Sequence, residues 1–130
     1  MIKPPFPTSH LRLKRAYEPA EPKDGVRILI DRLWPRGVSK AKAALDDWMK
    51  DIAPSAKLRQ WFSHDPTRWV EFQRRYRAEL RERSQELAHI RALAKTKTVT
   101  LVYSAHDEEH NDAVVLKAVL LGEKRSPHNG

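Results

Sequence analysis

The chain has 130 residues, of which 40% are hydrophobic, and this is enough for one domain with one core but too short for two domains of ordinary size. Its 25 Lys and Arg residues against 17 Asp and Glu residues give a net charge of +8, so the surface attracts polyanions in general, whether nucleic acid, anionic lipid or small phosphates. There is no cysteine, which excludes disulfides, thiol catalysis and cysteine-based zinc sites.

The first third of the chain predicts two strands. Three prolines within residues 3–9 predict an extended and loosely held start. Residues 10–17 alternate in character with charges on both faces, which is typical of a strand at the edge of a sheet. Residues 18–25 form a predicted loop closed by an Asp-Gly turn, and the β-branched run Val26–Ile30 predicts a second strand.

The middle of the chain predicts helices. Ser39 can cap a helix over residues 40–50, and Ser55 a second one ending at Phe62. Asp65-Pro66 then starts a long apolar stripe with steps of three or four residues. An unbroken helix over residues 66–95 would be roughly 45 Å long. A domain of this size has a radius of gyration of only about 14 Å, so we expect the helix to bend or break at Ser84.

The last third predicts a strand over residues 98–103, a helix over 111–121 and a mobile tail from 123. The fold class we expect is a single α/β domain, a layer with a short, mainly parallel sheet flanked by helices and one long bent helix. About sixty helical residues before the last strand suit a right-handed parallel crossover. The loop joining the first two strands suits a hairpin better, and their orientation stays open. The ordered core should span residues 10–121, with flexible ends at 1–9 and 122–130.

Two of the predicted strands run into polar turns. Val26–Ile30 is followed by Asp31-Arg32-Leu33-Trp34-Pro35-Arg36-Gly37, and the later strand by Ser104-Ala105-His106-Asp107-Glu108-Glu109-His110-Asn111. If the strands are parallel, both turns open at the same sheet edge, which is where open α/β sheets bind ligands. Every function predicted from these turns requires Ile30 and Tyr103 to leave the sheet side by side.

The first turn predicts an anion site. The guanidinium groups of Arg32 and Arg36 can clamp a phosphate or carboxylate, with Trp34 as a stacking surface and Asp31 orienting an arginine. The structural alternative is that Asp31 forms an ion pair with one arginine while Trp34 fills the end of the sheet as part of the core.

The second turn predicts further ligand contacts. Amides at the following helix start, with the Ser104 or Asn111 side chain, can receive an anion. Asp107 and His110 are the natural general acid and base if the protein is a catalyst. The structural alternative is that Asp107 and its two neighbouring glutamates are capping charges. His106 and His110 fit an H-x-x-E-H zinc pattern, but few residues remain for a third ligand, so we predict no metal and no cofactor.

The long helix carries many arginines interleaved with glutamates: Arg68, Arg74, Arg75, Arg77, Arg81 and Arg83, against Glu71, Glu79, Glu82 and Glu86. A solvated, salt-bridged face is the ordinary interpretation. A nucleic-acid-binding face is the alternative, supported by the net positive charge. No zinc finger, RNP motif or helix-turn-helix signature accompanies it.

Several motifs together resemble the YeaO-like proteins, a branch of domain-of-unknown-function family 488. The motifs that carry the resemblance are Asp31–Gly37, Lys50–Ser55, Leu58–Phe62, His64-Asp65-Pro66 with Trp69, Leu101–Ala105 and Asp107–Asn111. The resemblance covers roughly residues 10 to 121 and implies a small bacterial α/β protein with a mainly parallel sheet. It implies no particular reaction. Similar sequences often carry Lys at the position of His106, which argues against any scheme requiring an imidazole there.

The leading hypothesis is a pocket for a small anionic ligand, bearing phosphate or carboxylate, at the C-terminal strand ends, with acid/base chemistry by Asp107 and His110 if any occurs. The alternative is a non-enzymatic nucleic-acid-binding protein, and a third is a module for protein contacts. No apolar run approaches the ~18 residues of a membrane span, so we expect a cytoplasmic protein without a membrane partner. The sequence does not indicate an oligomeric state.

Overall fold

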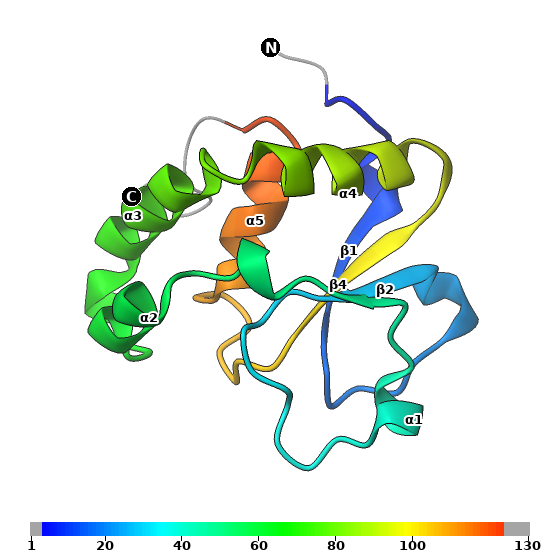
Figure 1. The fold of residues 1–130 in the computed structure, drawn as a ribbon, viewed down its shortest axis with the longest axis horizontal. Coiled ribbons are helices and arrows are strands. Elements are labelled where there is room, and N and C mark those ends of the chain that lie inside the picture. Colours follow the sequence, from blue (N-terminus) through cyan, green and yellow to red (C-terminus); the bar gives the residue numbers. More distant parts are fainter. Residues whose placement is uncertain (1–3, 124–130) are drawn as a thin grey trace.

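The protein folds around a four-stranded parallel sheet, and the computed structural model describes residues 4–123 (Figure 1). The strands are β1 (Leu11–Arg15), β2 (Val26–Leu29), β3 (Asp47–Trp48) and β4 (Val99–Tyr103), in the order β1-β4-β2-β3. The helices are α1 (Lys40–Ala43), α2 (Ala56–Phe62), α3 (Trp69–Leu80), α4 (Ser84–Thr96) and α5 (Asp112–Leu120). The predicted fold class, a small α/β layer with a short parallel sheet, is confirmed.

The first two strands are parallel to each other and are not neighbours. Both pair in parallel with β4, so the connection over residues 16–25 carries the chain across the sheet to the far side of β4. The hairpin favoured by the loop length therefore does not form. All five residues of β4 are buried, and an apolar strand of this kind is most stable in the sheet centre, with β1 at the edge as predicted.

The two faces of the sheet bury different chemistry. One face is apolar and packs against α2, α3, α4 and α5 to form the main core; its buried side chains include Leu11, Ile28, Leu101, Tyr76, Ile90 and Leu116. The other face carries Arg12, Lys14, Thr100 and Arg27 beside a small apolar cluster of Ala16, Leu29 and Val102. Figure 1 shows α1 set apart from α3, α4 and α5. The alternation read from residues 10–17 thus separates a core face from a charged face.

Helices α2 and α5 each begin directly after a residue whose side chain caps the helix. The Ser55 hydroxyl accepts a hydrogen bond from the Leu58 amide (3.1 Å) at the start of α2. The long helical stretch breaks as expected, because α3 ends at Leu80 and α4 begins at Ser84. The Asn111 side chain accepts from the Val114 amide (3.0 Å) and caps α5. Within residues 4–123, no helix has the length and apolar character needed to cross a membrane.

The predicted helix over residues 40–50 is wrong beyond Ala43. Ala44 takes a left-handed conformation (φ 47°) that ends α1. The chain then runs along β2, where the Asp46 amide donates to the Arg27 carbonyl (2.8 Å) and the Met49 amide to the Leu29 carbonyl (2.9 Å). Pairing with the open edge of β2 satisfies these backbone groups, and this tertiary gain outweighs a helical pattern that is only locally favourable.

Residues 6–10 pack more closely than the prolines of this segment predict. Phe6 is buried in the main core, and residues 8–10 form a turn of 3-10 helix. The predicted mobile tail lies outside the described residues from position 124 onward. Part of the start of the chain thus belongs to the folded domain.

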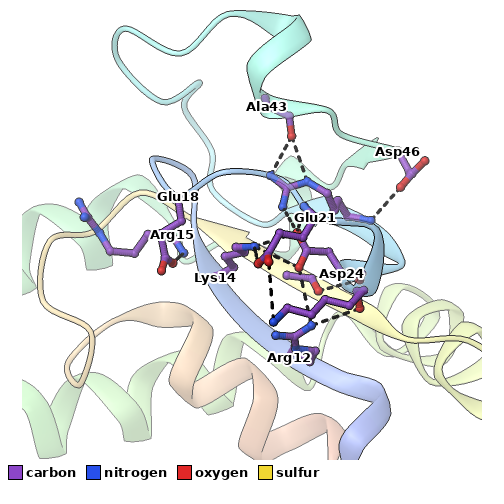
Figure 2. A network of polar contacts seen from close by, with 11 residues as sticks. Arg12, Lys14, Arg15, Glu18, Glu21, Asp24, Ala43 and Asp46 are labelled. Carbon is purple, nitrogen blue, oxygen red and sulfur yellow. Dashed lines mark hydrogen bonds and ion pairs between the residues drawn. The ribbon is translucent and has the colours of Figure 1, made fainter.

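A buried charge network covers the polar face of the sheet (Figure 2). The carboxylate of Asp24 is fully buried and accepts from Lys14 Nζ (3.1 Å) and Arg27 Nη1 (2.8 Å). Arg27 also donates to the Ala43 carbonyl from Nη2 (2.8 Å), and Lys14 reaches the exposed carboxylate of Glu21 (2.7 Å). The network ties the crossover loop and the end of α1 to the sheet, and it gives each buried charge an opposite partner.

Candidate functional site

The exits of β2 and β4 lie side by side, as the predicted site requires. The Ile30 amide donates to the Val102 carbonyl (3.1 Å), which extends the β2–β4 pairing by one residue. One residue further, Asp31 Oδ2 accepts from the amide and the hydroxyl of Ser104 (2.8 and 2.7 Å). The two polar turns are therefore joined at their first residues.

A cavity of about 640 Å³ opens at this edge of the sheet. All eight residues predicted for the site contribute to its wall: Asp31, Arg32, Trp34, Arg36, Ser104, Asp107, His110 and Asn111. The wall also contains residues that the sequence analysis did not assign to the site, among them Tyr17, Arg59, His64, Phe62, Phe72 and Asp112. The geometry brings the predicted residues together, and their roles remain predictions.

Arg32 has a guanidinium nitrogen, Nε, that is buried without a hydrogen-bond partner in the described residues. The residue lines both the main cavity and a second one of about 250 Å³. Arg36 lies exposed at the wall of the main cavity. A buried guanidinium N–H without an acceptor costs free energy, and a ligand acceptor would relieve that cost.

Asp31 does not orient an arginine, contrary to prediction. Its carboxylate accepts from Ser104 and shares a hydrogen bond with the side chain of Asp112, while its carbonyl accepts from Trp48 Nε1 (2.7 Å). Strand pairing puts Ser104 directly beside Asp31, and this nearby donor pair satisfies the carboxylate without an arginine. Asp31 thus couples the first turn to the second.

Trp34 is a fixed part of the wall. Its indole N–H donates to the Val38 carbonyl (2.6 Å), and its ring packs edge-on against Trp48 with 5.4 Å between centroids. Both rings pack against the small cluster on the polar face of the sheet. The structural alternative for this residue therefore holds, although part of the ring still lines the cavity.

Asp107 and His110 form a pair at the wall, with 2.9 Å between Oδ2 and the ring Nδ1. The other carboxylate oxygen accepts from the amides of Glu109 and His110 (2.9 and 3.0 Å). Partial burial opposes ionisation of Asp107, but the amide of Glu109 and the contacts with His110 outweigh it and lower the pKa of this carboxyl. The His110 ring packs edge-on against Trp69, with centroids 5.2 Å apart. The pair is fixed by the turn that contains it.

Asn111 and the first amides of α5 are occupied by the protein itself. The Asn111 side chain accepts from Val114 and donates to the Asp107 carbonyl (2.9 Å), and the residue is only 2% exposed. The Ala113 amide donates to the Asp112 carboxylate (3.0 Å). The predicted use of this helix start to receive an anion is therefore not what the geometry favours, because capping residues already take these donors.

Asp112 is one of the wall residues that sequence reasoning missed. It follows the capping Asn111, where an acidic side chain ordinarily reads as a favourable charge at a helix start. In the fold its carboxyl lines the cavity and meets that of Asp31. Burial, together with the negative charge of Asp31, raises the pKa of Asp112 well above its usual range. Asp112 thus keeps its proton at pH values where an isolated aspartate is ionised.

The Asp112→Asn variant should be more stable than the native protein, by about 1 kcal/mol at pH 8. The folded protein holds a proton that the unfolded chain loses near pH 4, so this residue costs stability as pH rises from there through its raised pKa. An asparagine donates to Asp31 without a titrating proton. Urea unfolding between pH 4 and pH 8 measures the gain, which should vanish at the acidic end.

Asp107→Asn is the matched control with the opposite sign. The pKa of Asp107 is lowered in the fold, so its contribution to stability is present at neutral pH and lost only as pH falls below about 4. Its replacement should lower the unfolding free energy at pH 8. A loss of stability in Asp112→Asn at every pH would show that the raised pKa plays no part in stability.

The two histidines of the zinc-like pattern have different surroundings. His106 is exposed, whereas His110 turns toward Asp107 and Trp69. Over residues 4–123, no group of three or more metal-ligating side chains has the spacing to hold an ion. The described part of the chain therefore offers no geometric basis for a metal site.

Comparison with known proteins places the chain in a family. A family model described as the inactive DUF488-N3 subclade matches residues 10–129. The chain belongs to this family. The uncharacterized protein YeaO of Escherichia coli K12 is 45% identical over 107 residues, covering 82% of this chain and 93% of YeaO. The uncharacterized protein Rv3073c of Mycobacterium tuberculosis H37Rv is 40% identical over 114 residues, covering 88% and 96% of the two chains. No solved structure matches.

Membership of the DUF488 family confirms the resemblance drawn from the turn motifs. The match begins at residue 10, just before β1, so it includes all four strands and both polar turns. The family thus covers the whole cavity wall, from Tyr17 to Asp112.

Proposed function

We propose that this protein binds a small anionic ligand, bearing phosphate or carboxylate, in the cavity at the C-terminal ends of β2 and β4. The observation that carries the proposal is the buried Nε of Arg32, which has no acceptor within residues 4–123 and belongs to a side chain in the cavity wall. Arg36 and Arg59 line the same cavity, so cationic groups from two separate segments face one space. The volume of about 640 Å³ suits a ligand of metabolite size.

The proposal concerns binding, and catalysis at this site is a separate prediction. The matched family is an inactive subclade by its description, which favours a protein that binds without turnover. The acid/base role of Asp107 and His110 stays a prediction and rests on their 2.9 Å contact at the wall. The cytoplasm is the compartment we propose.

Arg32→Ala should weaken binding of the ligand roughly 10- to 100-fold, the loss expected for a charge-assisted contact. The apo protein should keep its melting temperature, because no hydrogen bond or ion pair within residues 4–123 depends on this guanidinium. A thermal-shift panel of inorganic phosphate, sugar phosphates, nucleotides and organic acids, followed by calorimetry on those that stabilise, measures both quantities.

Arg81→Ala is the control, since it removes the same charge from an exposed position that lines neither cavity. This variant should show the same thermal shift and the same affinity with each ligand as the native protein. If no member of the panel stabilises the native protein, or if Arg32→Ala and Arg81→Ala lower affinity equally, the proposal is overturned.

No specific observation favours the nucleic-acid face on α3. Glu71 accepts from Arg74 Nε (2.9 Å) and Arg75 Nε (2.8 Å), and these contacts lower the pKa of Glu71 to about 2. Arg75 also lies over the Trp61 ring, 4.3 Å from its centroid. Charges compensated in this way are typical of a solvated helix face, and they contribute little free attraction for phosphates.

A further inference from the structure

The wall of the cavity carries both signs of charge. Three arginines face it, and three aspartates do so as well: Arg32, Arg36 and Arg59, against Asp31, Asp107 and Asp112. A bare inorganic anion would gain from the arginines and be repelled by the carboxylates only a few residues away. A ligand with an anionic group at one end and hydrogen-bond donors at the other would satisfy both sets.

The carboxyls of Asp31 and Asp112 are the part of the wall that favours a ligand with hydrogen-bond donors. Asp31 accepts from the hydroxyl of Ser104 and shares a hydrogen bond with Asp112, and both carboxyls line the cavity. The two oxygens of one carboxylate have about four lone-pair positions. Asp31 uses three of them, for the Ser104 amide, the Ser104 hydroxyl and Asp112, so acceptor capacity remains. Vicinal hydroxyls or amino groups of a ligand are the natural complement to such a pair.

The rim of the cavity includes two exposed apolar side chains. Across residues 4–123, the exposed large hydrophobic side chains are Tyr17 (38%), Leu33 (60%) and Val70 (66%). Two of these three, Tyr17 and Leu33, line this cavity, while Val70 lies on α3 outside it. Arg15 lies over the Tyr17 ring, 5.1 Å from its centroid, and holds it in place. Exposed apolar side chains gathered at a cavity mouth are typical of contact with a ring of a ligand.

We propose that the cavity takes a nucleoside phosphate, either free or at the end of a nucleic-acid chain. The phosphate contacts Arg32 and Arg36, the sugar hydroxyls reach the Asp31–Asp112 pair, and the base lies against Tyr17 and Leu33. This inference rests on the proposed anion site and adds the class of ligand. Inorganic phosphate, sugar phosphates and simple organic acids lack the planar ring, so they leave the apolar rim without a partner.

Four probes separate the three contacts by calorimetry: AMP, ribose 5-phosphate, inorganic phosphate and adenosine. We expect AMP to bind roughly 10-fold more tightly than ribose 5-phosphate, because base stacking on exposed side chains adds about that much. Ribose 5-phosphate should in turn bind more tightly than phosphate, and adenosine more weakly than AMP. A hexanucleotide with a 5′-phosphate, compared with the same chain lacking it, tells a chain end from the free nucleotide.

Variants of the rim test the same inference. Tyr17→Ser combined with Leu33→Ser should reduce the preference for AMP over ribose 5-phosphate to about twofold or less, leaving the affinity for ribose 5-phosphate unchanged. Val70→Ser removes a similarly exposed apolar side chain outside the cavity. It should change neither the preference for AMP nor the affinity for ribose 5-phosphate. Both positions are exposed, so the melting temperature of the variants should stay near that of the native protein.

The outcomes are distinguishable from failure of the anion site itself. Equal affinity for AMP, ribose 5-phosphate and inorganic phosphate overturns the nucleoside inference and leaves the anion site standing. Adenosine binding as tightly as AMP overturns the anion site, because the phosphate then contributes nothing. A preference for AMP that survives in the rim variant shows that the base lies elsewhere, and it also overturns the inference.

Discussion

Replacing Asp24 by alanine is expected to lower the free energy of unfolding by about 3–5 kcal/mol, the cost of removing one partner from a buried ion pair. The Asp24 side chain is 0% exposed, and it faces Lys14 and Arg27, whose side chains are 10% and 4% exposed. The variant leaves both cations next to a void, Arg27 without an ion pair within residues 4–123 and Lys14 with only the exposed carboxylate of Glu21. Urea unfolding followed by circular dichroism measures the loss.

The effect is large because Asp24 connects separate parts of the sheet. Its carboxylate binds Lys14 on β1 and Arg27 on β2, and its carbonyl accepts from the Thr100 hydroxyl on β4 (2.7 Å). Glu21→Ala is the matched control: it removes another carboxylate that contacts Lys14, but from an exposed position. Its effect on stability should be small, because water replaces an exposed carboxylate at little cost.

The pH dependence gives a second check on the same residue. Burial alone would raise the pKa of Asp24, but the Glu21 amide, Lys14 and Arg27 outweigh it and lower that pKa. A lowered carboxyl pKa gives stability that is present at neutral pH and lost as pH falls below about 4. The difference in unfolding free energy between the native protein and Asp24→Ala should therefore decrease at acidic pH. Equal stability of Asp24→Ala and Glu21→Ala at pH 7 would contradict the role of the network.

Gly25→Ala should cost about 3 kcal/mol or more of unfolding free energy. Gly25 has φ +64°, a conformation that residues with a side chain rarely adopt. An added Cβ would also lie 2.1 Å from the Thr98 carbonyl oxygen, which accepts from the Val26 amide (2.9 Å) at the start of the β2–β4 pairing. Backbone atoms must move to relieve the clash, and this hydrogen bond is the first to be lost. The melting temperature and urea midpoint measure the effect.

Gly37→Ala separates the cost of a positive φ from the cost of the clash with Thr98. Gly37 also has a positive φ (+78°), but nothing lies within 4 Å of the position its Cβ would take. This variant should lose only the conformational cost, about 1–2 kcal/mol. The difference between the two variants then reports the close approach of β2 and β4. If Gly37→Ala is as destabilising as Gly25→Ala, the clash with Thr98 is not what makes Gly25 necessary.

Local signals were sufficient for most of the elements. The cap at Ser55 and the polar break at Ser84 set helix bounds as predicted, because a cap or a break acts within one turn of its own residue. The spacing of residues 44–48 predicts a helix, but the structure has the short strand β3 there. Only hydrogen bonding to the free edge of β2 makes the extended conformation more stable than the helix.

The candidate site was predictable to the extent that it depends on strand ends. Two polar turns after two strands, if parallel, must meet, and the contact of Asp31 with Ser104 (2.8 Å) is the result. Tyr17, Arg59 and Asp112 were not assigned to it, since each joins the cavity from another segment of the chain. Asp112 carried a signal, an acidic residue in a first helical turn, but that signal has an ordinary structural meaning.

The sequence by itself determined the ends of most helices, the buried strands and the turns that carry the polar groups, because these depend on interactions among near neighbours in the chain. Only the tertiary structure decided the strand order β1-β4-β2-β3, the burial of Asp24 between Lys14 and Arg27, and the meeting of Asp31 with Asp112. These depend on the crossover over β4, which is chosen by the burial of the whole apolar strand and not by any residue of the loop. Charges far apart in sequence become neighbours only after that choice is made.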